Sequence, residues 1–151
     1  MLITFPQNIA IGCTVYNDAN QSIGDAAWTD FAFNQEEEDT DGFHSTVTNT
    51  NRITIPTGLD GVYLFLGEVQ WASNATGVRG LRFMKGATSA KGLDLRMANN
   101  GITTNMSTNA RYRMSAGEYM TFQGYQSSGG NLNADYVASY SVFFSAIFLG
   151  R

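Results

Sequence analysis

The sequence has few of the residues that usually carry catalytic chemistry or cross-link a small fold. Among its 151 residues there are one cysteine, Cys13, and one histidine, His44. A single cysteine cannot form a disulfide within the chain, so stability has to come from packing, from assembly or from a ligand. The sequence contains no phosphate-binding loop, nucleophile elbow, zinc-protease motif or paired-cysteine zinc spacing. We therefore expect a protein that is not an enzyme and binds no cofactor.

Charged residues are also scarce, at 15% of the chain against roughly 25% in an average soluble domain. The net charge of −4 disfavours nucleic acid as a partner, because binding it requires basic side chains that replace condensed counterions. The first twelve residues lack the basic start of a secretory signal. The longest apolar run near the C-terminus, 142–149, is far shorter than the about 20 residues that span a bilayer. We expect neither a nucleic-acid nor a membrane partner.

The pattern that the sequence does show is an alternation of apolar residues with a period of two. No window keeps an apolar stripe at helical spacing, whereas several segments alternate, and ten Phe, seven Tyr and two Trp suit half-buried positions on strands. Gly, Asn, Asp and Pro clusters separate these segments. Strands are predicted at 10–16, 28–33, 52–55, 61–71, 78–84, 92–97, 105–114, 118–125 and 136–149. Short strands at this spacing predict an all-β antiparallel sandwich or barrel formed by one domain, residues 13–151, which follows a short arm, residues 1–12.

The segment 61–71 is apolar on both faces. One face carries Val62, Leu64 and Leu66, and the other carries Tyr63, Phe65, Val69 and Trp71. In a sandwich of two sheets only one face of each sheet meets the internal core. A second apolar face calls for another cover, such as a neighbouring subunit. The sequence therefore predicts an oligomer.

Several segments resemble the complement-type globular-head domain of the tumour-necrosis-factor-like superfamily. The residues that carry the resemblance are Trp28 before an acidic loop, Ile53 to Pro56, Gly61 with Tyr63, Gly117 with Glu118, and Phe143 to Leu149. The resemblance covers about 13–149 and implies a jelly roll of about ten strands that forms a homotrimer around its inner sheet. The candidate residues for the trimer interface are Tyr63, Phe65, Trp71, Tyr140 and Phe143.

The acidic run from Glu36 to Asp41 is a candidate calcium site, because it places five carboxylates within six residues and calcium prefers oxygen ligands. The candidate ligands are Glu38, Asp39 and Asp41. The run lacks the EF-hand pattern, since Phe43 follows where a further ligand is required and no Glu closes the loop. A solvated acidic loop is the alternative interpretation. His44 beside this run could pair with a carboxylate or remain an ordinary polar side chain.

The DTDGFH loop, residues 39–44, and the WASNATG turn, residues 71–77, resemble most the forms of this domain found in tailed-bacteriophage structural proteins. This resemblance implies a virion structural protein on the outer surface of the particle, and we expect a capsid decoration trimer that contacts the major capsid protein or another virion protein. The arm is apolar and carries little charge, as expected of a segment that orders against a partner. Its candidate anchor residues are Leu2, Ile3, Phe5 and Ile9.

The alternative function is a receptor-binding head on a tail fibre or baseplate that recognises a host glycan or protein. Carbohydrate sites often place exposed aromatic rings beside Asn, Asp and Gln. The sequence places Tyr112, Tyr119 and Tyr125 near Asn-rich loops.

Overall fold

The structure, a computed structural model, describes residues 10–138 and 140–151. All the regular structure in this part of the chain is β-strand, and it includes no helix that could cross a membrane. Twelve strands are present where about ten were expected. They are β1 Gly12–Tyr16, β2 Gln21–Ile23, β3 Thr29–Asp30, β4 Gln35–Asp39, β5 Arg52–Thr54, β6 Gly61–Trp71, β7 Val78–Lys85, β8 Ser89–Met97, β9 Thr104–Met114, β10 Tyr119–Gln126, β11 Leu132–Asp135 and β12 Phe143–Gly150.

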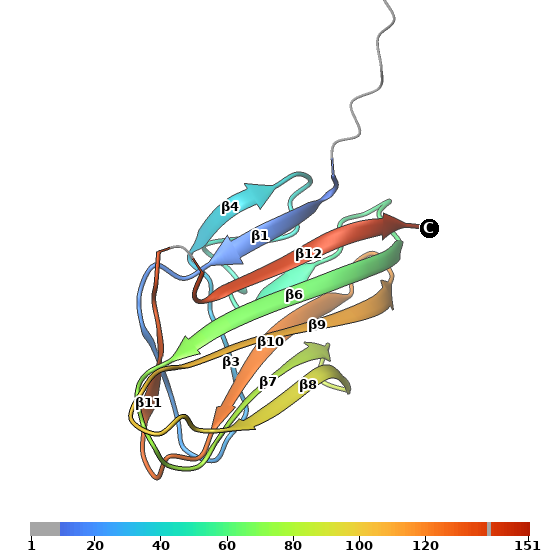
Figure 1. Cartoon of the computed structure of the whole chain (residues 1–151). Coiled ribbons are helices and arrows are strands. Elements are labelled where there is room, and N and C mark those ends of the chain that lie inside the picture. The colour runs from blue at the N-terminus through green and yellow to red at the C-terminus, as the bar shows by residue number, and fades with distance from the viewer. Residues whose placement is uncertain (1–9, 139) are drawn as a thin grey trace, which may run out of the picture.

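The strands form two antiparallel sheets that pack face to face (Figure 1). Sheet A has the order β2-β11-β6-β12-β1-β4, and β9 pairs with the free side of β6. Sheet B has the order β3-β10-β7-β8, and β5 pairs with the end of β10. Neighbours in each sheet are mostly distant in sequence, which is the connectivity of a jelly roll. The predicted all-β antiparallel sandwich is confirmed.

The predicted strand bounds agree best where the apolar alternation is strongest. The strand β6 covers 61–71 as predicted, and β9 begins one residue before its predicted start. The last strand begins only at Phe143, because residues 136–138 and 140–142 lie outside it, where the start of the strand was predicted. The strands β2 and β4 lie in segments predicted as loops, and β11 was not predicted. All three are short strands in polar sequence.

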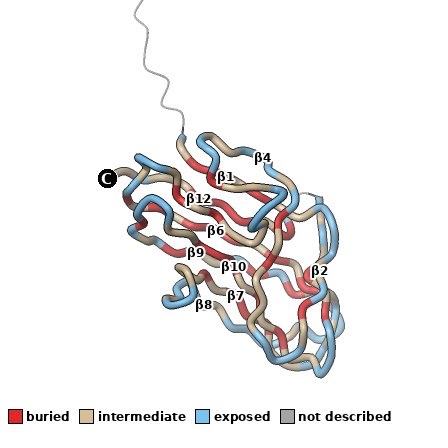
Figure 2. The backbone as a smooth tube through the Cα atoms, turned by 180° about the vertical axis from the view of Figure 1, so that it is seen from behind, coloured by how far each residue is buried: buried red, intermediate tan, exposed pale blue. Residues whose placement is uncertain are grey.

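Aromatic rings fill the space between the two sheets. Phe65 and Phe144 of sheet A contact Phe83 and Phe122 of sheet B, with ring centroids 5.6–6.2 Å apart between the sheets. Gly67 of β6 provides room for this cluster, because a Cβ at that position would lie 2.4 Å from the ring of Phe122. Figure 2 shows the buried residues alternating along the central strands. Sheet A therefore has one face against a dense core and one face directed outward.

Candidate functional site

The outward face of sheet A is apolar along its centre. Val62, Leu64 and Leu66 of β6 are half-buried and lie on this face, opposite to the fully buried side chains of the same strand. Ile147 of β12 pairs with Leu64 across the two strands and lies on the same face. Phe143 occupies the same face four pairs along the ladder. We call these five residues the sheet A face. Within 10–138 and 140–151, no strand covers it.

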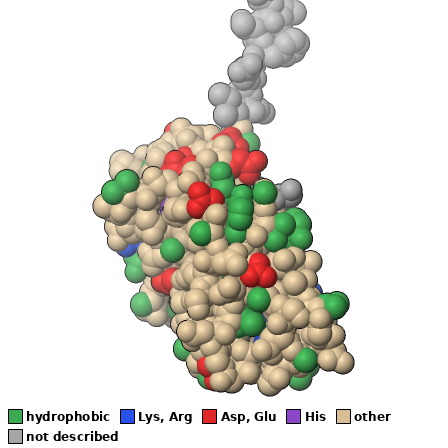
Figure 3. All heavy atoms as spheres, turned by 90° about the vertical axis from the view of Figure 1, so that its left-hand side faces the viewer, with side chains coloured by type: hydrophobic (Ala, Val, Ile, Leu, Met, Phe, Trp, Pro, Cys, Tyr) green, Lys and Arg blue, Asp and Glu red, His purple; other side chains and the backbone are tan. Residues whose placement is uncertain are grey.

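Charges of opposite sign flank the sheet A face. On the β9 side, exposed Arg111 lies opposite Leu64, and exposed Arg113 lies opposite Val62. On the β4 side, Glu37 and Glu38 are exposed. Figure 3 shows acidic side chains gathered at the upper end of the molecule, where β4 lies in Figure 1. The face thus has a basic margin and an acidic margin with an apolar stripe between them.

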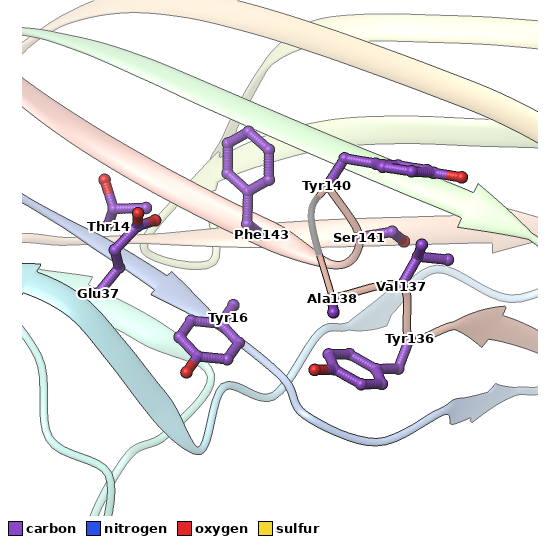
Figure 4. A pocket seen from close by; sticks show the side chains of 9 residues that line it. All are labelled: Thr14, Tyr16, Glu37, Tyr136, Val137, Ala138, Tyr140, Ser141 and Phe143. Carbon is purple, nitrogen blue, oxygen red and sulfur yellow. The ribbon is translucent and has the colours of Figure 1, made fainter.

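A pocket of about 550 Å³ opens beside Phe143 at one end of this face (Figure 4). Glu37 lies at one end of the pocket, and Tyr136 and Tyr140 lie at the other. Tyr16 and Phe143 lie between them. The pocket therefore combines four aromatic rings with one carboxylate.

Three of the five predicted interface residues lie on the wrong face of β6. Tyr63, Phe65 and Trp71 are 0% exposed within the sandwich, so their side chains are inaccessible to a neighbouring subunit. Tyr63 donates a hydrogen bond to the Leu59 carbonyl at 2.7 Å, and burial raises the pKa of its phenol to about 12. The alternation correctly grouped these residues together. The prediction failed because both faces are apolar, and the period alone does not say which of them the second sheet covers.

The other two predicted interface residues are accessible. Phe143 is half-buried on the sheet A face, and Tyr140 is 37% exposed beside it. The hydroxyl of Tyr140 lies 2.9 Å from Oε1 of Gln70. Both side chains line the pocket.

The acidic run is a structural element in which Asp39 closes a turn. Its Oδ1 accepts the backbone N–H groups of Asp41, Gly42 and Phe43 at 2.9–3.3 Å, and its Oδ2 accepts that of His44 at 3.0 Å. One carboxylate thus holds four backbone donors of the turn after β4. The predicted ligands Glu38, Asp39 and Asp41 are not brought together, since no cluster of three His, Cys, Asp or Glu suited to a metal occurs in the described residues.

His44 has an acceptor at each ring nitrogen. Its Nδ1 lies 3.0 Å from Oε1 of Glu36, and its Nε2 lies 3.2 Å from the carbonyl oxygen of Thr50. The His44 side chain is 0% exposed. His44 therefore connects β4 to the segment before β5. Its position beside the acidic run indicated the pairing with a carboxylate but not the contact with the Thr50 carbonyl.

The three tyrosines considered for glycan contact are already covered. Lys91 Nζ lies 4.3 Å from the ring centroid of Tyr112, and Arg52 Cζ lies 4.5 Å from that of Tyr119. The ring of Tyr125 packs against Trp28 at 5.3 Å. Because a cation or another ring occupies one face of each, they are poorer platforms for a sugar than the sequence indicated.

Cys13 is buried in β1 and is 3% exposed. Burial raises the pKa of its thiol, and the carboxylates of the neighbouring acidic strand, chiefly Asp39, raise it further. The thiol is therefore held in its protonated form and is a small core residue. The predicted anchor residues Leu2, Ile3, Phe5 and Ile9 lie outside the described residues.

Comparisons with known proteins identify the fold. No protein-family description matches the chain, and no curated protein is similar to it in sequence. Among solved structures, the globular domain of a zebrafish complement 1qA protein aligns with 93% of this chain and 98% of its own, with a TM-score of 0.63 at 11% identity. Murine APRIL at pH 5.0 aligns with 93% and 100%, with a TM-score of 0.67 at 9% identity. The Eiger TNF of S. frugiperda gives 93% of both chains and a TM-score of 0.58 at 11% identity. The fold is therefore the tumour-necrosis-factor-like jelly roll.

Proposed function

We propose that this chain is a non-catalytic structural subunit that forms a homotrimer through its sheet A face. The observation that carries the proposal is the apolar stripe of Val62, Leu64, Leu66, Phe143 and Ile147, which the second sheet leaves uncovered. An uncovered apolar stripe between polar margins is typical of a protein contact surface. The margins are complementary in charge, so a ring of copies can place the basic margin of one subunit against the acidic margin of the next.

Within a virus, we propose that the trimer is a bacteriophage capsid decoration protein on the outer surface of the particle. The support is the sequence resemblance of the 39–44 loop and the 71–77 turn to phage structural proteins. The partner in this proposal is the major capsid protein or another virion protein. In this proposal the arm provides the attachment through its apolar residues Leu2, Ile3, Phe5 and Ile9.

Assembly is tested by light scattering coupled to size exclusion at micromolar concentration. The wild-type chain is expected to elute as an assembly, and Leu64→Asp is expected to lower its mass by placing a charge in the centre of the stripe. Val47→Asp is the matched control, because Val47 is 84% exposed in a loop away from sheet A. A wild-type chain that is monomeric would contradict the proposal, as would a Leu64→Asp variant with unchanged mass.

The position in the particle is tested by quantitative mass spectrometry of purified virions. A copy number near that of the major capsid protein is the expected result, and its absence from the particles would contradict a virion role. Removal of residues 1–9 should abolish particle binding without affecting assembly. Residues 11 and 12 must remain, because the Ile11 carbonyl accepts a bond from Phe148 N–H at 2.9 Å and Gly12 bonds to Thr40.

The second candidate is a receptor-binding head, and the aromatic pocket favours it. Tyr16, Tyr136 and Tyr140 supply rings on which a sugar could stack, and Glu37 supplies an acceptor for hydroxyl groups. A few copies per particle, together with loss of adsorption to host cells in Tyr136→Ala, would support this candidate over decoration. Binding to host cells that is unchanged in this variant would contradict it.

A further inference from the structure

We propose that two copies of this chain pair along β8, edge to edge and antiparallel, about a two-fold axis at Leu95. This contact is separate from the sheet A face, because β8 belongs to sheet B. It joins two subunits, or two trimers, through a continuous sheet. The occupant of the β8 edge is thus a second copy of this chain.

The first argument is exposure. The described chain has few large apolar side chains that are more than half exposed, and three of them are consecutive outward positions of β8: Leu93 at 61%, Leu95 at 53% and Met97 at 72%. Since alternate residues of a strand share a face, these three side chains form one stripe. No residue of β8 is buried, and Figure 2 shows the strand without buried segments. Such a stripe is costly to leave in water.

The second argument is the edge beyond Gly92, whose carbonyl accepts the hydroxyl of Thr108 in β9. The strand β8 is the last in sheet B and pairs on one side only, with β7 (Figure 1). The N–H of Ala98, just after β8, donates to the Gly77 carbonyl at 3.0 Å on the β7 side. Because the direction of bonding alternates along an antiparallel strand, Arg96 bonds toward β7, and the backbone groups of Leu95 and Met97 point to the open edge. An edge of this kind is a template for another strand.

The third argument is that the sequence of β8 is complementary to itself. Residues 93–97 read Leu, Asp, Leu, Arg, Met. In an antiparallel pair centred on Leu95, Leu93 of one copy lies opposite Met97 of the other, and Asp94 lies opposite Arg96. A contact about a two-fold axis requires a surface that is complementary to itself, and each residue pair away from the axis occurs twice in it. This register places apolar residues together on one face and opposite charges together on the other.

The side chains of Asp94 and Arg96 are both partly exposed for this contact. Its Oδ2 lies 2.7 Å from Arg96 Nη2 of the same chain, yet it makes no hydrogen bond of acceptable geometry. Arg96 is half exposed at its side chain. Oδ2 of Asp94 is buried within its own chain, so a second copy can reach only Arg96 and the part of the Asp94 side chain that remains exposed.

Sedimentation equilibrium of the full chain and its variants tests the proposal. Leu95→Asp is expected to halve the assembly mass, from six chains to three if the sheet A contact forms and from two to one if it does not. Val47→Asp, which changes an exposed apolar residue elsewhere, should leave the mass unchanged. An equal mass for Leu95→Asp and wild type would overturn the β8 pair. A failure of the proposed trimer would be seen separately. It would change the assembly mass of the wild-type chain but not the twofold decrease in mass expected for Leu95→Asp.

Charge exchange tests the register. In Asp94→Arg, an arginine at position 94 of each copy lies opposite Arg96 of the other. In Arg96→Asp, an aspartate at position 96 of each copy lies opposite Asp94 of the other. Each single variant should therefore halve the assembly mass. The double variant restores opposite charges in reversed order and should recover the wild-type mass. A double variant that remains at half mass would contradict the proposed register.

A cross-link provides a readout that does not depend on charge. In the proposed pair the two Leu95 Cα atoms are opposite each other at about 5.5 Å, within the range that a disulfide spans. Leu95→Cys should therefore form a covalent dimer under mild oxidation. Leu93→Cys is the control, because its two copies would lie four residues apart along the strands, roughly 13 Å. Equal cross-linking at both positions would overturn the two-fold axis at Leu95.

Discussion

The two faces of β6 both carry large apolar side chains but differ in chemistry and in cover. The inward face carries the rings of Tyr63, Phe65 and Trp71, which are fully buried against sheet B. The outward face carries aliphatic Leu64 and Leu66, which are half-buried and which no strand of the described part of the chain covers. Large rings fill the space between two sheets, whereas branched aliphatic chains form a smoother surface. The comparison teaches that, in a strand with apolar residues on both faces, side-chain volume predicts which face lies between the sheets better than hydrophobicity does.

The largest effect should separate these two faces directly. Phe65→Ala removes a ring from the stacked core and should lower the free energy of unfolding by about 3–5 kcal/mol. Leu64→Ala should cost only about 1 kcal/mol in the dissociated chain, because the side chain is already partly in water. Urea unfolding at a protein concentration low enough to dissociate assemblies measures both. Equal losses would contradict the assignment of the two faces.

The next largest effect is the pH dependence of stability, which tests whether the phenol on the inward face of β6 is buried. The phenol of Tyr63 has its pKa raised to about 12 in the fold, above its ordinary value of about 10. The neutral form is therefore favoured by folding, and its contribution is complete below about pH 10 and is lost as pH rises toward 12. Tyr63→Phe should flatten this alkaline loss, which is of the order of 1–3 kcal/mol. An unchanged alkaline profile, followed by circular dichroism, would argue against burial of the phenol.

A third prediction extends the comparison to the two edge strands. Asp39 at the end of β4 accepts four backbone N–H groups, whereas Asp94 of β8 contacts only half-exposed Arg96. Asp39→Ala should cost about 2 kcal/mol, since donors in a partly buried turn lose their acceptor. Asp94→Ala should cost less than about 1 kcal/mol in the dissociated chain. Thermal unfolding of both variants under the same dilute conditions gives the ranking, and the reverse order would refute this account of the acidic turn.

The smallest effect lies away from both faces, at the turn before β10. Glu118 lies 2.7 Å from Lys85 Nζ and accepts the N–H of Ser115, and these contacts, the first above all, lower the pKa of its carboxyl. Its contribution to stability is present above the unfolded-state pKa of about 4.3 and is lost as pH falls through the lower folded value. Glu118→Gln should slightly weaken the acid dependence of the melting temperature. A melting temperature that depends more steeply on acid pH in the variant than in the wild type would contradict the lowered pKa of Glu118.

Sequence reasoning was reliable where a pattern repeats and failed where contacts are local. The strand β6 was predicted to the residue because its apolar run is bounded by turn residues, with Gly61 at one end and residues 73–77 after the other. The strand β4 was predicted as a loop because four of its five residues are acidic, which is a composition that suits only an exposed edge. Nothing in the sequence distinguishes such an edge from a solvated turn.

The candidate site was predicted in part for the same reason. Phe143 and Tyr140 were predicted at the trimer interface, and both are accessible to a neighbouring subunit. Tyr63, Phe65 and Trp71 were assigned to the wrong face of a correctly predicted strand. The acidic run was a candidate calcium site, with a solvated loop as the alternative, because composition shows carboxylates but not the backbone donors that Asp39 already binds. The β8 stripe follows from a period of two, but its exposure requires the knowledge that β8 is an edge.

The burial of Cys13 has a consequence for the environments in which this chain keeps one covalent form. Oxidants and disulfides react with a thiolate, and here the only thiol of the chain is enclosed and held protonated. The thiol therefore offers no ready site for disulfide exchange, and the chain contains no internal disulfide that a reductant could break. A subunit that folds in one compartment and acts in another can cross between them without reductive unfolding or adventitious cross-linking.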